Sequence, residues 1–90
     1  MWETDKILVK KLNNLNALLL ELSTTEEITY NLSNGWYEIN PRFKELKNEI
    51  YIVSSNINGY LEYLNNTLTT KSNKKHYLHI NYAEYKAEII

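Results

Sequence analysis

The sequence of 90 residues has no cysteine, one proline and two glycines. Without cysteine the chain can form no disulfide, zinc–thiolate site or iron–sulfur centre, so its stability must come from packing. Long apolar runs are also missing. The longest one in the first twenty residues, Ala17–Leu20, is too short for a secretion signal or a membrane span. These absences predict a cytoplasmic protein that does not enter a membrane.

An excess of charge of either sign is missing as well. Eleven acidic and ten basic side chains give a formal net charge of −1. Such a chain offers no overall electrostatic attraction to a phosphate backbone or an anionic membrane. A chain of this length buries only about 60–65% of its unfolded surface. We therefore expect residues 1–90 to form one small domain without room for a deep cleft that binds several substrates.

What the sequence does have is a strong bias towards four residue types. Asparagine, isoleucine, lysine and tyrosine make up 39 of the 90 residues, whereas arginine occurs once and alanine three times. All four favoured residues have AT-rich codons. This bias indicates an AT-rich genome, such as that of a low-GC bacterium or of a phage or mobile element that it carries.

Apolar residues spaced by three and four predict two amphipathic helices. The first covers about residues 4–22, with Thr4 as its N-cap. The second covers about residues 41–70, begins with an Asn40 cap and an N1 proline, and is open to a kink at Gly59. A hairpin around residues 50–63 is the alternative for part of it. The core stripes of the two helices are Leu8, Leu12, Leu15, Leu19 and Leu22, and Phe43, Leu46, Ile50, Val53, Ile57, Tyr60, Leu64 and Leu68.

Between the helices, residues 27–40 predict a β-hairpin, because Asn34-Gly35 favours a two-residue turn between two alternating segments. In that register Leu32 opposes Tyr37 and Tyr30 opposes Ile39. One face, expected to be buried, then carries Ile28, Tyr30, Leu32, Tyr37 and Ile39. A short helix that ends at Gly35 is the alternative.

The tail, residues 76–90, fits both a strand and a helix. As a strand it could add to the sheet of the predicted hairpin, because an isolated hairpin is marginally stable in water. The sequence therefore predicts an α+β fold of two helices, a hairpin and a C-terminal strand or helix, with an all-α helical bundle as the alternative.

No arrangement of residues points to catalysis or to a cofactor. His76 and His79 are the only imidazoles, and with Glu84 they hold the minimum for a metal, but their spacing matches no zinc signature. The sequence has neither a nucleophile elbow nor a glycine-rich phosphate loop. We expect a protein that is not an enzyme and that binds no metal.

Surplus aromatic residues favour a function in binding. Five of them lie off the predicted core faces, and tyrosine and tryptophan are enriched in protein interfaces. This candidate partner surface comprises Trp2, Trp36, Tyr51, Tyr63 and Tyr77. The leading hypothesis is a small inhibitor or adaptor that covers a surface of a larger protein, with self-association into a homodimer left open.

Two alternatives remain from the sequence. A nucleic-acid-associated regulator would use the one basic cluster that has an aromatic neighbour. This cluster comprises Lys71, Lys74, Lys75 and His76, next to Tyr77. A small immunity protein or antitoxin is the other alternative, and the sequence does not separate it from the inhibitor.

Overall fold

The computed structural model describes residues 6–68 and 75–90. Its elements follow in the order α1 (Lys6–Ser23), β1 (Ile28–Asn31), β2 (Trp36–Ile39), α2 (Pro41–Leu68), β3 (Leu78–Asn81) and β4 (Lys86–Ile89). Two helices and two antiparallel strand pairs make an α+β fold, as the sequence predicted. Thr4, the expected N-cap, lies outside the described residues.

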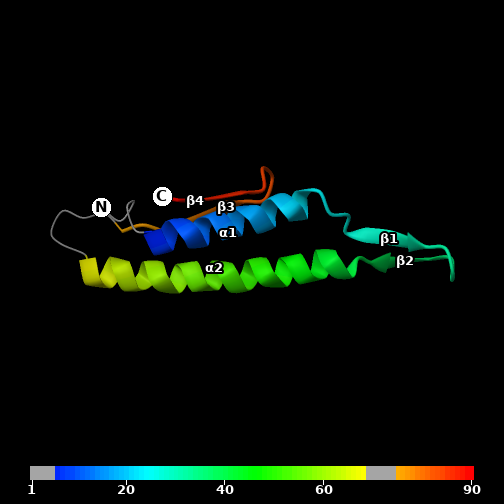
Figure 1. Ribbon diagram of the computed structural model, residues 1–90, viewed down its shortest axis with the longest axis horizontal. Coiled ribbons are helices and arrows are strands. Elements are labelled where there is room, and N and C mark those ends of the chain that lie inside the picture. Colours follow the sequence, from blue (N-terminus) through cyan, green and yellow to red (C-terminus); the bar gives the residue numbers. More distant parts are fainter. Residues whose placement is uncertain (1–5, 69–74) are drawn as a thin grey trace.

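The core lies between the two long helices, which run side by side (Figure 1). Each contributes an apolar stripe at the predicted helical spacing, with Leu61 buried in addition to the predicted residues. The predicted residues Leu12, Phe43, Val53, Tyr60 and Leu64 are only partly buried at the border of this core. The buried residues of the helices are Leu8, Leu15, Leu19, Leu22, Leu46, Ile50, Ile57 and Leu61. The apolar stripe of α2 is covered within one chain as far as Leu64, which is half-buried.

α2 begins as the sequence predicted and runs without a break. The Oδ1 of Asn40 accepts a hydrogen bond from the N–H of Arg42 at 3.0 Å, which caps the helix ahead of its N1 proline. The helix continues through Gly59, and no kink or second hairpin forms there. In the described part of the chain, no side chain and no other segment lies within 4 Å of where a Cβ on Gly59 would sit. Gly59 is therefore tolerated in this helix and is not needed by its packing.

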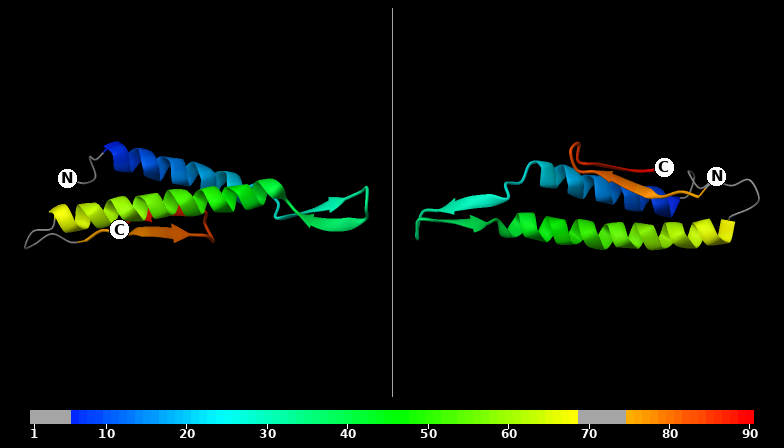
Figure 2. Two further views of the ribbon diagram at one scale, coloured as in Figure 1. Left: turned by 90° about the horizontal axis from the view of Figure 1, so that it is seen from below. Right: turned by 180° about the vertical axis from the view of Figure 1, so that it is seen from behind.

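β3 and β4 form a hairpin that packs against one side of the helix pair (Figure 2), and we call it the docked hairpin. Its register pairs Leu78 with Ile89 and Ile80 with Ala87, which places these four side chains on the face towards the core. The sequence left the tail open between a helix and a strand that could add to the sheet of the first hairpin. The tail forms strands, but in a separate sheet, because its apolar face packs on the helices.

Each helix also holds one edge of the docked hairpin by an asparagine side chain. Asn16 of α1 donates to the Ala87 carbonyl at 3.0 Å and accepts from the Ala87 N–H at 2.8 Å. Asn65 of α2 makes the same pair with His76, at 2.8 and 3.0 Å. In the β3–β4 ladder these backbone groups point away from the partner strand. The two carboxamides therefore satisfy strand edges that would otherwise be left open.

β1 and β2 form the other hairpin, which we call the tip hairpin. It continues the long axis of the molecule beyond the ends of both helices (Figure 1), in a chain that measures 62 × 19 × 19 Å. Its base is closed by Asn40, which donates from its backbone N–H to Glu27 and from its side chain to the Glu26 carbonyl. The tip hairpin is thus fixed at its base and projects from the helices.

Candidate partner-binding surface

The turn of the tip hairpin is longer than the sequence analysis expected. The strands pair Ile28 with Ile39 and Tyr30 with Tyr37, so four residues, 32–35, form the loop. Gly35 has a φ of +72°, in the left-handed region that glycine adopts without strain. The observed register is thus shifted by two residues from the one that a two-residue turn at Asn34-Gly35 predicts. Because side chains alternate between the two faces of a strand, a shift of two residues leaves each one on its predicted face. Only Leu32 leaves the predicted apolar face, because it now lies in the loop.

Side-chain amides organise this longer turn. Asn31 accepts the N–H of Ser33 through Oδ1 at 2.8 Å, and Asn34 accepts the N–H of Trp36 at 2.9 Å. The amides of both asparagines also donate to one carboxylate oxygen of Glu38, at 3.1 and 3.2 Å. These bonds replace the backbone ladder where the strands separate. They give the polar side of the tip hairpin a defined structure.

The other side of the tip hairpin carries Ile28, Tyr30, Tyr37 and Ile39, which we call the apolar tip face. The tyrosine rings pair across the strands with centroids 5.1 Å apart. The sequence analysis expected this face to be buried, and that is wrong. Its four side chains are 53%, 52%, 75% and 60% exposed. The alternating pattern identified the apolar face correctly, but the tip hairpin lies beyond the helix ends, where no residue of 6–68 or 75–90 covers it.

Comparison of the two hairpins shows what the tip hairpin lacks. Both consist of two four-residue strands and a four-residue loop, and the second follows the first by 50 positions. The apolar tip face therefore corresponds position by position to Leu78, Ile80, Ala87 and Ile89, the face of the docked hairpin that packs on α1 and α2. One face is covered and its counterpart is open to solvent. The sequence analysis did not find this repeat, because only three of the twelve aligned residues are identical.

The aromatic residues that the sequence analysis proposed as a partner surface do not form one patch. Trp2 lies outside the described residues. The other four are exposed, from 59% to 71%. Trp36 lies on the polar side of the tip hairpin, whereas Tyr51 and Tyr63 are separated by about 18 Å and about 120° on α2. Tyr77 precedes the docked hairpin. Of the four that the structure describes, only Trp36 belongs to the tip hairpin, on the side opposite the apolar tip face.

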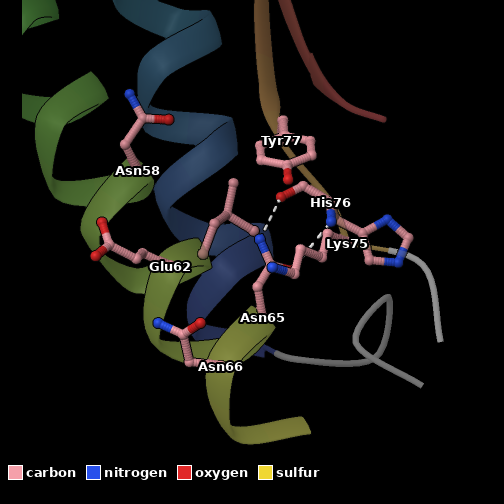
Figure 3. A pocket seen from close by; sticks show the side chains of 8 residues that line it. Asn58, Glu62, Asn65, Asn66, Lys75, His76 and Tyr77 are labelled. Atoms are coloured by element: carbon pink, nitrogen blue, oxygen red, sulfur yellow. Dashed lines mark hydrogen bonds between the residues drawn. The ribbon is translucent and has the colours of Figure 1, made fainter. Parts of the chain in front are cut away.

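The proposed basic contact is only partly described. Lys71 and Lys74 lie outside the described residues. Lys75 is exposed and His76 is half-buried, with its backbone held by Asn65. Lys75, His76 and Tyr77 line an open pocket of about 270 Å³ against α2, together with Glu62 and three asparagines (Figure 3). An acidic side chain in the same lining does not favour a phosphate there.

The histidine pair brings no metal ligands together. His79 points outward from β3, where its strand partner is Glu88. Among residues 6–68 and 75–90, no three histidine or carboxylate groups lie close enough to hold a metal ion. In the same ranges, neither helix is long and apolar enough to cross a bilayer.

Charge on the tip is of one sign. Residues 24–41 contain Glu26, Glu27 and Glu38 and no lysine, arginine or histidine, so their formal charge is −3. The nearest cation, Arg42, binds Glu21 at 2.8 Å across the ends of the two helices. The hydrogen bond from Arg42 lowers the pKa of Glu21, and the same contact raises the pKa of Arg42. Arg42 is thus already paired with acidic side chains of the helices.

Comparison of the chain with protein-family models, with curated proteins and with solved structures finds no match.

Proposed function

We propose that the protein is a non-enzymatic binding module that attaches to a larger protein through the tip hairpin. The observation that carries the proposal is the apolar tip face: four large apolar side chains, each more than half exposed, on a hairpin whose counterpart in the same chain is covered. Exposed apolar surface of this kind marks an interaction site.

The length of the connection between the helices supports a role beyond linking them. Two antiparallel helices are ordinarily joined by about 2–8 residues. Here 17 residues, 24–40, separate the end of α1 from the start of α2. Those residues build two strands and an organised turn, although nothing in the described chain packs on their apolar side. A simple connection does not need such a structure.

Area arithmetic indicates how a partner must bind. A fully exposed aromatic side chain offers roughly 150–250 Å², so the apolar tip face offers on the order of 450 Å². At about 25 cal/mol per Å² this gives on the order of 10 kcal/mol, similar to the roughly 4–15 kcal/mol that association costs. The face alone therefore binds weakly. A stable partner must extend around the tip hairpin to Leu32 and Trp36, which are 87% and 70% exposed.

This proposal retains the leading hypothesis from the sequence, an inhibitor or adaptor from a phage or mobile element of a low-GC bacterium. Occupying a partner's surface through a projecting tip suits such a role, since it needs no catalytic group.

Affinity capture with matched variants tests the proposal. The bait is the whole chain, compared with Tyr30→Ser/Tyr37→Ser at the tip and with Tyr51→Ser/Tyr63→Ser on α2. Both double variants remove two exposed tyrosines and one ring contact, the Tyr30–Tyr37 pair at the tip or the stack of Tyr63 on Tyr60 in α2. We expect one protein from the encoding organism to bind the unmodified chain and the α2 variant and to be lost with the tip variant. Equal capture by all three baits, or loss with the α2 variant alone, would refute the tip as the binding surface.

A further inference from the structure

The docked hairpin shows, within this chain, how the equivalent face of the tip hairpin can be covered. Its apolar face packs on both helices, in one core cluster with buried aliphatic side chains such as Leu15 and Ile57. Its β4 edge is held at Ala87 by the carboxamide of Asn16. The residue of the tip hairpin that corresponds to Ala87 is Tyr37. By the register of the ladder, the N–H and C=O of Tyr37 also point away from the partner strand.

The negative charge of the tip hairpin favours some classes of partner over others. The three glutamates of residues 24–41 repel phosphates, which disfavours nucleic acid and anionic lipid. They also repel the same residues of a second copy placed tip to tip. A protein with lysine or arginine around an apolar centre complements them, because interfaces pair potentials of opposite sign.

We infer that the tip hairpin, if the proposed function holds, docks on a helical surface of its partner, with an aliphatic ridge beneath the apolar tip face and basic side chains around it. The partner's helices take the place that α1 and α2 take under the docked hairpin. A polar side chain of the partner then meets the β2 edge at Tyr37, as Asn16 meets Ala87. The basic rim lies opposite Glu26 and Glu27 at the base of the tip hairpin.

Photo-cross-linking from a defined position tests this inference. The whole chain carries p-benzoylphenylalanine in place of Tyr37 and is expressed in cells of the encoding organism. The control carries the same group in place of Tyr51, which is similarly exposed on α2. We expect position 37, and not position 51, to cross-link to a partner segment that forms a helix, with aliphatic residues spaced by three and four and lysine or arginine beside them.

Binding of the purified pair then tests the charge. We expect Glu26→Gln/Glu27→Gln to weaken binding about tenfold at low salt and the difference to shrink as salt is added. The control is Glu84→Gln/Glu88→Gln on the docked hairpin, which should leave the affinity unchanged. Cross-links to a strand edge, an acidic surface, a second copy, lipid or nucleic acid overturn the inference. It is also overturned if the affinity of the purified pair changes neither with salt nor in Glu26→Gln/Glu27→Gln. Absence of any protein cross-link from position 37 overturns the proposed function itself.

Discussion

The side chain of Asn16 and the backbone of Ala87, 71 positions apart, exchange two hydrogen bonds of 3.0 and 2.8 Å. The asparagine carboxamide does here what a residue of a third strand does in a sheet: it donates to and accepts from one residue of the neighbouring strand. Together with the bonds from Asn65 to His76, it fixes the docked hairpin to the helices at both edges.

Replacing this carboxamide with a carboxylate should destabilise the fold. Asn16→Asp removes the donor and places a negative charge beside the Ala87 carbonyl, so we expect a loss of about 1–3 kcal/mol at neutral pH. The loss should shrink in acid, where the introduced group is protonated and can donate. Chemical denaturation at several pH values measures both effects. Asn13→Asp, at an exposed site on the same helix, is the control. An equal loss there would contradict a stabilising role of the hydrogen bonds between Asn16 and Ala87.

The two glycines should respond in opposite ways to alanine. Gly59→Ala should stabilise the protein by about 1 kcal/mol, because alanine is the better helix former and its Cβ meets open space. Gly35→Ala should destabilise the tip hairpin by about 1 kcal/mol, because φ is positive there. Thermal unfolding reports the first change. Amide exchange at Glu38 and Asn40, whose N–H groups face the partner strand, reports the second, since the tip hairpin shares little packing with the core.

Tyr85 occupies the position in the docked hairpin that Gly35 holds in the tip hairpin, and its φ is +54°. A tyrosine in this region costs about 1–2 kcal/mol relative to its ordinary conformations. We therefore expect Tyr85→Gly to raise or preserve stability although it removes a large side chain. Tyr82→Gly, in the same loop but without the positive φ, should lower it. Stability that falls equally in both variants would show that contacts of the Tyr85 ring outweigh the strain.

Neighbouring serines of α2 offer another matched pair. The hydroxyl oxygen of Ser54 is buried and has no hydrogen-bond partner in the described part of the chain, whereas Ser55 is exposed. Both changes to alanine improve helix propensity by about 0.5 kcal/mol. Ser54→Ala also removes an unsatisfied buried group and should gain about 1 kcal/mol more than Ser55→Ala. Urea denaturation of the two variants measures the difference, and equal gains would argue for a bound water at Ser54.

The ion pair of Glu21 and Arg42 should make the stability of the fold depend slightly on pH in the acidic range. The pKa of Glu21 is lowered by its hydrogen bond from Arg42, so the pair stabilises the fold above the ordinary glutamate pKa of 4.5. That contribution is lost as the pH falls through the lowered value. NMR titration should show the Glu21 pKa return towards 4.5 in Arg42→Gln. Both groups are exposed, so added salt should reduce the shift in the unmodified chain.

The helices could be predicted closely, because Leu8 to Leu22 and Phe43 to Leu64 repeat at helical spacing over several turns. The existence of the tip hairpin followed from Asn34-Gly35, but its register did not, since the amides of Asn31 and Asn34 favour a four-residue turn. Alternation in the tail was compatible with a strand, and only tertiary contacts with the helices decide between strand and helix.

The candidate surface was harder to predict. Periodicity shows which side chains share a face but not whether another element covers that face, and this is why Ile28 and Tyr37 were assigned to the interior. The hydrogen bonds of Asn16 and Asn65 to the docked hairpin leave no periodic signal in the sequence either. A single polar residue at the border of an apolar stripe looks like any solvent-exposed position.

Among the described residues, the tip hairpin joins the rest of the molecule only at its base, through Asn40 and the strand ends that run into the helices. Substitutions at Ile28, Tyr30, Tyr37 or Ile39 therefore leave the packing of α1 and α2 untouched. The tip hairpin can therefore be exchanged, lengthened or randomised while the helix pair and the docked hairpin serve as a constant scaffold. This separation makes the chain a suitable framework for selecting new binding specificities, and it allows partner choice to evolve independently of foldability.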